Sequence, residues 1–187
     1  MNALVLILVG VLITPALAAA AWIVDALNAR GKKLVLFVDH YNAGRSQLAQ
    51  AYMREKYGRY FHAISAGVTP EQGIYPLVYE LMTRVGLAHR LTRPRRLNEA
   101  LIAKAIPVLL CPEEEIQPID PTAIALLNRN EHTIRWRDID GLIGKTSIEE
   151  VKDIFADIRR RIDSLVLSLL APNGNSVGVA SGNDARA

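Results

Sequence analysis

The sequence predicts a three-layer α/β domain with a four-stranded, parallel, doubly wound sheet, preceded by one transmembrane helix. Three observations predict it. Short strand-like runs alternate with stretches of helical periodicity, two of those runs are continuously apolar as buried parallel strands are, and an uncharged apolar segment precedes them all. The 187 residues allow one ordinary domain with extensions.

The N-terminal segment, residues 3–24, is uncharged and mostly apolar. As a helix it would be roughly 33 Å long, enough to cross a bilayer. Trp22 lies near its end, where an interfacial aromatic is expected, and no Lys or Arg precedes it, whereas Arg30, Lys32 and Lys33 follow it. The positive-inside rule therefore predicts a single-pass protein of the inner (cytoplasmic) membrane, with the main domain in the cytoplasm.

The same segment has one feature of a cleaved secretory signal. Residues 15–19, Pro-Ala-Leu-Ala-Ala, are similar to a small-residue cleavage site, and cleavage would leave the domain exported. The absence of a basic side chain at the start of the segment favours the anchor. A buried core helix is disfavoured, because a helix that is apolar all round has nothing to bury it in so small a domain.

The rest of the chain divides into a linker at 25–32, a globular domain at 33–170 and a tail at 171–187. The tail is rich in Asn, Gly, Ser and Ala, and we expect it to be disordered. The candidate strands are 33–38, 60–65, 106–110 and 133–137. The candidate helices are 46–57, 75–86, 95–104, 113–128 with an interruption by Pro, and a last one from Ile148. That last helix has the clearest amphipathic spacing, and Thr146 or Ser147 caps its start.

The composition argues against several functions. With 22 basic and 19 acidic residues the net charge is only +3, which does not indicate nucleic-acid binding. Cys111 is the single cysteine, so neither an intrachain disulfide nor a cysteine-based zinc site can form. The four histidines lie far apart without metal-ligand spacing. We therefore predict no metal and no cofactor.

The first strand runs into a loop that has the form of an anion site. A strand, a short loop and a helix N-terminus gather backbone N–H groups and the positive end of a helix around one point. Gly44 permits unusual backbone angles, Arg45 offers a two-pronged donor to an oxyanion, and Asn42 and Ser46 can hydrogen-bond across the loop. The predicted anion-binding set is His40, Tyr41, Asn42, Ala43, Gly44, Arg45 and Ser46.

The run Asn42-Ala43-Gly44-Arg45-Ser46-Gln47-Leu48-Ala49 resembles the active-site loop of the low-molecular-weight protein tyrosine phosphatases and thioredoxin-coupled arsenate reductases, especially the reductase form. Further segments are similar to later parts of the family: 65–70, 73–77, 81–86, 108–111, 136–140 and the helix from Ile148. The resemblance covers about residues 33–170. It implies the phosphotyrosine phosphatase I-like fold and a phosphate-like oxyanion or a phosphorylated protein as partner.

The family's roles carry over to individual positions. Arg45 would hold the oxyanion, Asn42 and Ser46 would order the loop, and Asp140 would protonate the leaving group. Gly141 stands where family members usually have Pro after this Asp, and Asp138 is a possible substitute. The relay of the reductases needs two further thiols, so the resemblance implies no redox role for Cys111, which we interpret as a small apolar residue at a strand end.

The chain departs from the family at Asp39, where the nucleophilic thiolate would stand. A carboxylate is a poorer nucleophile, repels a phosphate dianion, and would draw the loop N–H groups to itself. Three hypotheses follow: a catalytically impaired phosphate binder, a phosphoric monoester hydrolase with an Asp39 nucleophile aided by a divalent cation at Asp39, Asp138 and Asp140, or a membrane-tethered interaction module with an empty loop.

Two further features could contribute to binding. The basic stretch 89–96 could contact anionic lipid head groups or a phosphorylated partner, although exposed charge runs are more often solvated loops. Tyr41 and Tyr75 could flank the mouth of the loop, although tyrosines at element ends are usually packing residues.

Overall fold

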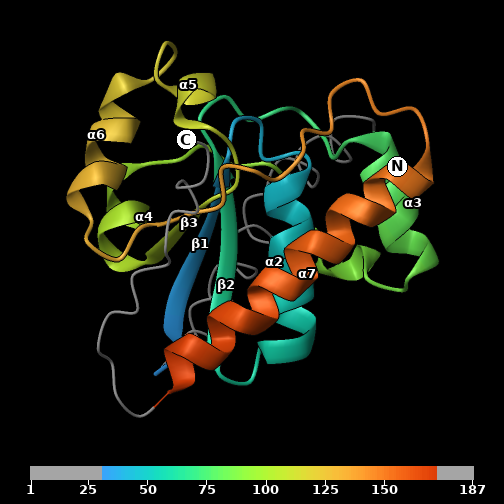
Figure 1. Cartoon of the computed structure of the whole chain (residues 1–187), viewed down its shortest axis with the longest axis horizontal. Coiled ribbons are helices and arrows are strands. Elements are labelled where there is room, and N and C mark those ends of the chain that lie inside the picture. Colours follow the sequence, from blue (N-terminus) through green and yellow to red (C-terminus); the bar gives the residue numbers. More distant parts are fainter. Residues whose placement is uncertain (1–30, 172–187) are drawn as a thin grey trace, which may run out of the picture.

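The computed structural model describes residues 31–171 as a parallel sheet between two layers of helices (Figure 1). The strands are β1 (Lys33–Asp39), β2 (Phe61–Gly67), β3 (Ile106–Leu109) and β4 (Ile134–Arg135), in the order β2-β1-β3-β4 and all parallel. This confirms the predicted four-stranded parallel sheet. The predicted anchor and nearly all of the predicted linker and tail lie outside the described residues.

The helices alternate with the strands along the chain. They are α2 (Arg45–Tyr57), α3 (Pro76–Arg84), α4 (Glu99–Lys104), α5 (Glu113–Ile116), α6 (Pro121–Arg129) and α7 (Ile148–Leu170), with a 3-10 turn η1 (Ala88–Arg90). Among the described residues, none of the helices combines the length and the hydrophobicity that a membrane span requires.

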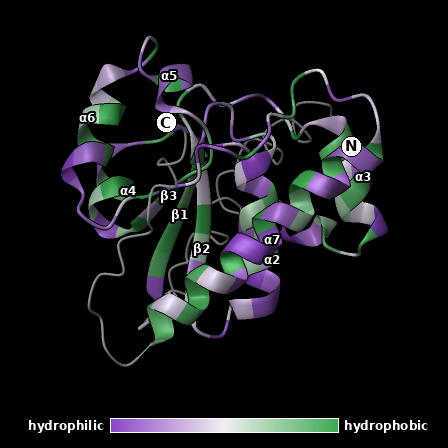
Figure 2. Cartoon of the chain, viewed as in Figure 1, coloured by the Kyte–Doolittle hydropathy of each residue, from purple (hydrophilic) through white to green (hydrophobic). Residues whose placement is uncertain are grey.

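Each face of the sheet has its own core, because successive strand residues point to opposite sides. Val35 and Phe37 of β1 pack with α2, α3 and α7, whereas Leu36 and Val38 pack with α4, α5 and α6. The two helical layers lie on either side of the strands in Figure 1, and Figure 2 shows the hydrophobic strands between them. The strands are therefore buried on both faces, as their continuous apolar runs predict.

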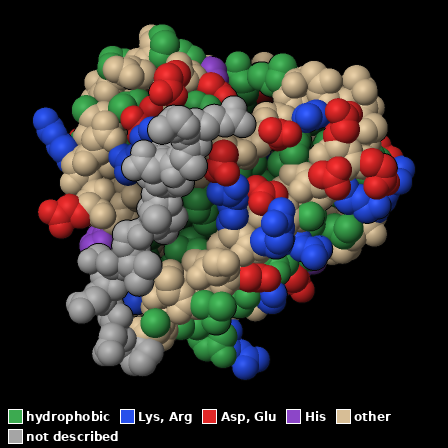
Figure 3. Space-filling view, viewed as in Figure 1, with side chains coloured by type: hydrophobic (Ala, Val, Ile, Leu, Met, Phe, Trp, Pro, Cys, Tyr) green, Lys and Arg blue, Asp and Glu red, His purple; other side chains and the backbone are tan. Residues whose placement is uncertain are grey.

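The helix α7 packs against α2 and α3 with its apolar side in the core. Ser147 caps it in a capping box, in which its side chain accepts from the Glu150 N–H and Glu150 reaches back to the Ser147 N–H. Its outer face carries alternating charges (Figure 3), and several form ion pairs, such as Arg161 with Asp157. A buried apolar stripe and a charged outer face are what the sequence periodicity predicts.

One predicted helix begins at a later residue, and another is interrupted, as its prolines predict. The helix expected at 95–104 begins only after Asn98, whose side chain caps it, because residues 95–97 pair with the end of β2 through Gly67. The helix expected at 113–128 is two helices, since Asp120 caps a new one at Pro121. Both changes place residues close to the loop after β1.

Candidate anion site

The loop at 40–44 lies at the carboxyl end of β1, where α2 begins (Figure 1). Asn42 adopts a left-handed backbone conformation with φ of 51°, which an Asn tolerates better than most residues. Its side chain donates to Ser46 Oγ across the loop at 2.9 Å and accepts from the Arg95 N–H at 2.8 Å. The Gln47 side chain donates to the Asn42 carbonyl at 3.1 Å. The loop is thus held from both sides.

The end of β2 lies directly against this loop. A Cβ atom on Gly67 would lie 2.6 Å from the Asn42 nitrogen and 2.8 Å from the His40 carbonyl oxygen. The loop backbone also bonds to the segment after β2, since Thr69 N–H donates to the His40 carbonyl at 2.9 Å. Only glycine leaves room for this approach, which explains why β2 ends in a glycine.

We call the space ringed by the backbone N–H groups of residues 40–46 the cradle. The Asp39 carboxylate itself occupies part of it. It is only 4% exposed, and its two oxygens accept from the N–H groups of Asn42 at 2.6 Å and Ser46 at 3.0 Å. An acidic group is favoured here because the N-terminus of α2 carries partial positive charge. The carboxylate therefore acts as an internal anion, as its charge predicts.

Other amides of the loop remain without an acceptor. Among the described residues, none accepts a hydrogen bond from the backbone N–H of Tyr41, Ala43, Gly44 or Arg45. Gly44 itself is pressed against Leu142, whose side chain a Cβ at this position would overlap. The cradle therefore keeps donors beyond those that Asp39 uses.

Arg45 is held away from Asp39. Its guanidinium is 9% exposed and donates to the Ile139 carbonyl at 3.2 Å and to Glu115 Oε2 at 3.1 Å. No sequence pattern points to Glu115, because this pairing joins residues 70 apart through the packing of α5 on the sheet. The charge of Arg45, the predicted anion-binding arginine, is thus already paired with a carboxylate.

Cys111 lies close to the loop but is not a reactive thiol. Burial raises its pKa to about 12, the nearby Arg45 lowers it, and the negative charges of Asp39 and Glu115 raise it further. The side chain is completely buried after β3. A thiol with this pKa is protonated at neutral pH, so the interpretation of Cys111 as a packing residue fits its surroundings.

The two candidate acids on the segment after β4 each face a basic side chain. The Asp140 side chain is 77% exposed and faces Lys145 at 3.9 Å. Arg161 donates to both oxygens of Asp138 and lowers the pKa of that carboxyl. Within residues 31–171, no contact links either acid to Asp39, and no group of three or more His, Cys, Asp or Glu is arranged to hold a metal ion. The suggested cation site at Asp39, Asp138 and Asp140 is therefore wrong.

The aromatic residues at the loop are in contact with it or with each other. The rings of His40 and Tyr41 stack at 3.9 Å between centroids. Tyr75 donates its backbone N–H to the Ala43 carbonyl at 2.9 Å and its hydroxyl to the Lys145 carbonyl at 3.1 Å. Tyr75 thus joins the loop to the segment that follows Asp140.

The basic stretch is fastened to the same loop. Besides the Asn42 bond, the Arg95 carbonyl accepts from the Gly67 N–H at 2.9 Å, and the Thr92 N–H donates to Gln47 at 3.1 Å. Arg90 pairs with Glu55. Within the described part of the chain, the side chains of Arg93, Arg95 and Arg96 have no ion-pair partner. We call these three the arginine rim.

Comparison with known proteins identifies the fold from solved structures alone. No protein-family model and no curated protein matches the chain. Solved structures do match and share its architecture. The domain has the fold of the low-molecular-weight phosphatases. A YwlE arginine phosphatase mutant, which has a phosphorylated active-site serine, is 18% identical, with a TM-score of 0.62 over 75% of this chain and 98% of its own.

Two other structures with this phosphatase fold represent the two activities of the resemblance. The low-molecular-weight protein tyrosine phosphatase of T. tengcongensis is 19% identical, with a TM-score of 0.59 over 72% of this chain and 98% of its own. The thioredoxin-dependent arsenate reductase of Corynebacterium glutamicum is 27% identical, with a TM-score of 0.52 over 75% of this chain and 65% of its own.

Proposed function

We propose that this chain is a membrane-tethered, catalytically impaired member of the low-molecular-weight phosphatase and arsenate reductase family. It binds a phosphate-like group, carried by a phosphorylated protein, at the loop of residues 39–46. One observation carries the proposal. The Asp39 carboxylate, which stands where the family has a thiolate, accepts hydrogen bonds from the N–H groups of Asn42 and Ser46.

Turnover is impaired for three reasons. Asp39 is negative and lies inside the cradle, so it repels the phosphoryl group that it would have to attack. Both of its oxygens already accept hydrogen bonds, which lowers their nucleophilicity. Asp140 is engaged by Lys145, and Gly141 follows it where the family usually has Pro, so its role as the general acid is weakened. These features together favour binding without chemistry.

Binding is supported by the donors that remain. The N–H groups of Tyr41, Ala43, Gly44 and Arg45 are available for an oxyanion, although an incoming phosphate must share the loop with Asp39 or displace it. The arginine rim lies beside the loop and offers three exposed or half-exposed cations. A phosphorylated segment rich in acidic residues matches both features, since its phosphate would bind the loop N–H groups and its acidic side chains would bind the arginine rim.

An active hydrolase with an Asp39 nucleophile is a second candidate. The phosphorylated serine in the YwlE mutant shows that an oxygen nucleophile can be phosphorylated in a protein of this fold. Asp39 differs from a serine because its attack would form an acyl phosphate. An aspartyl-phosphate trapped with hydroxylamine would identify this mechanism.

The test is hydrolysis of an aryl phosphate by the purified full chain, measured beside the Asp39→Cys variant. Because Cys111 lies close to position 39, both proteins carry Cys111→Ser, so that no disulfide forms. Asp39→Cys with Arg45→Ala is the matched control for activity that depends on the oxyanion arginine.

We expect no hydrolysis of the aryl phosphate by the parent, and hydrolysis by the Asp39→Cys variant that requires Arg45. That result would show an intact cradle that lacks only its nucleophile. Turnover by the parent would overturn the proposal in favour of the hydrolase. If neither the parent nor the Asp39→Cys variant hydrolysed the substrate, and the parent bound no phosphopeptide, the result would favour the interaction module with an empty loop.

A further inference from the structure

The end of the domain opposite the anion loop carries exposed apolar side chains. Tyr60 is 53% exposed, Leu167 is 73% exposed and Leu170 is 51% exposed. Tyr60 precedes β2, whose first residue pairs with Lys33, and Lys33 in turn donates to the Leu169 carbonyl at 3.1 Å. The three side chains therefore gather at the amino ends of β1 and β2. We call this part of the surface the basal end.

The preceding chain leaves the domain at this same end. Lys32 donates its amine to the Gly58 carbonyl at 2.7 Å, and Lys33 is bonded to the end of α7. These two bonds fix the entry of the chain between the start of β2 and the end of α7. The uncharged, mostly apolar residues 3–24 are joined to the basal end by a few residues only.

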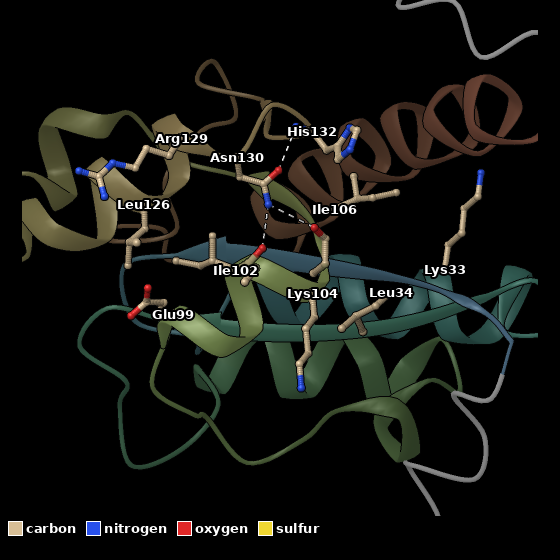
Figure 4. Close-up of a pocket in the computed structure, with 12 residues that line it drawn as sticks. Lys33, Leu34, Glu99, Ile102, Lys104, Ile106, Leu126, Arg129, Asn130 and His132 are labelled. Carbon is tan, nitrogen blue, oxygen red and sulfur yellow. Dashed lines mark hydrogen bonds between the residues drawn. The ribbon is translucent and has the colours of Figure 1, made fainter.

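A cavity of about 510 Å³ opens next to this entry point (Figure 4). Its floor is apolar, with Leu34, Ile102, Ile106 and Leu126. Its polar amide is already satisfied, since Asn130 donates to the carbonyls of Ile102 and Ala105. The cavity therefore presents an apolar surface rather than a polar group that awaits a ligand.

Basic side chains surround this cavity. Lys33, Lys104, Arg129 and His132 line it, with Glu99 as the single acid among the lining residues. Figure 4 shows Lys33, Lys104 and Arg129 pointing outward in different directions rather than toward one another. Among the described residues, none forms an ion pair with any of these three. Dispersed cations suit a surface with many negative groups better than they suit one small anion.

We propose that the basal end lies on an anionic bilayer surface, with lipid head groups at Lys33, Lys104 and Arg129 and the apolar side chains at the interface. Basic residues beside a membrane segment attract anionic lipids, and exposed apolar residues next to them add interfacial contact. The inference rests on the proposed membrane tether, since the apolar segment 3–24 precedes Lys33 by only a few residues of sequence.

This orientation also places the anion loop. The seven residues of β1 rise about 3.3 Å each, so Asp39 lies roughly 20 Å from Lys33 along the strand. With the basal end on the bilayer, the loop and the arginine rim face water. The phosphorylated partner would then be reached from the aqueous phase and not from the lipid.

The test uses the full chain reconstituted in vesicles of phosphatidylcholine, with or without a third of phosphatidylglycerol. Cys111→Ser removes the native thiol, and a fluorophore is attached at Leu170→Cys on the basal end or at Ile143→Cys near the loop, where the native residue is 79% exposed. Spin-labelled lipid quenches a fluorophore that lies at the membrane surface. Lys104→Glu with Arg129→Glu reverses two basal charges, and Arg93→Glu with Arg96→Glu is the matched reversal at the rim.

We expect quenching several-fold stronger at position 170 than at position 143, an increase with phosphatidylglycerol, and loss of that increase in the basal reversal but not in the rim reversal. Equal quenching at both positions, or equal effects of the two reversals, would overturn the proposed orientation while the tether stands. A chain that leaves the vesicles in carbonate wash would overturn the tether, and the orientation with it.

Discussion

Removal of the Asp39 carboxylate tests whether it acts as the internal anion of the loop. In Asp39→Ala, two buried N–H groups lose an ionised acceptor. A hydrogen bond to a charged group contributes about 1.5–3 kcal/mol, so two would contribute roughly 3–6 kcal/mol. Desolvation of the buried carboxylate offsets part of this. We expect a net loss of about 2–4 kcal/mol, which corresponds to roughly 6–12 °C in Tm for a domain of this size.

The distinguishing result is the response to an added anion. Sulfate that enters the vacated cradle binds only the native state, and at ten times its Kd it would restore about 1.4 kcal/mol. Thermal unfolding of the full chain is followed by circular dichroism with sulfate or with chloride at equal ionic strength. Sulfate should raise the Tm of Asp39→Ala clearly and that of the parent little.

The matched control is Asp138→Ala, because Asp138 is an exposed carboxylate that pairs with Arg161. Its loss should cost no more than about 1 kcal/mol and create no response to sulfate. If Asp39→Ala were as stable as the parent, or if sulfate stabilised both proteins equally, the carboxylate would not be the occupant of the cradle.

Three further results are expected. In the Asp39→Cys background, Glu115→Gln should raise kcat/KM for an aryl phosphate several-fold, because Arg45 loses its ionic partner. A decrease would mean that Glu115 holds Arg45 in its productive position. Gly67→Ala should destabilise the fold by more than about 2 kcal/mol in urea unfolding, because its Cβ would meet loop backbone, whereas Gly73→Ala, with open space around it, should change stability little. The hydrogen bond from Arg135, together with the charge of Arg137, lowers the pKa of Glu113. The contribution of the ionised Glu113 to folding stability is therefore fully present above about pH 4.3 and is lost as pH falls through the lowered pKa. Glu113→Gln should accordingly lose less stability than the parent between pH 6 and pH 3.

The sheet and most helices could be predicted because their signals are local. Continuous apolar runs, helical spacing from Ile148 and the capping serine all lie within short windows. The start of α4 could not be predicted in this way. Its expected first turn pairs with Gly67, about 30 residues earlier, and that pairing depends on the assembled sheet.

The candidate site divides along the same line. The loop conformation, the bond between Asn42 and Ser46 and the inward carboxylate of Asp39 follow from a strand, a turn and a helix that are adjacent in sequence. The partner of Arg45 and the direction of Asp140 depend on segments that meet only in the folded domain. Sequence patterns carry no signal for such distant pairs, so Glu115 was not predicted.

The position of Asp39 at the end of β1 makes its carboxylate a competitor that is present at very high effective concentration. A group held by rigid structure next to its target competes at an effective concentration far above that of a free solute. Free phosphate at millimolar levels is therefore a weak competitor for the N–H groups of Asn42 and Ser46. A ligand that adds contacts elsewhere, such as acidic groups on the arginine rim, has the advantage. The loop would then ignore the phosphate pool of a cell and respond to a macromolecule.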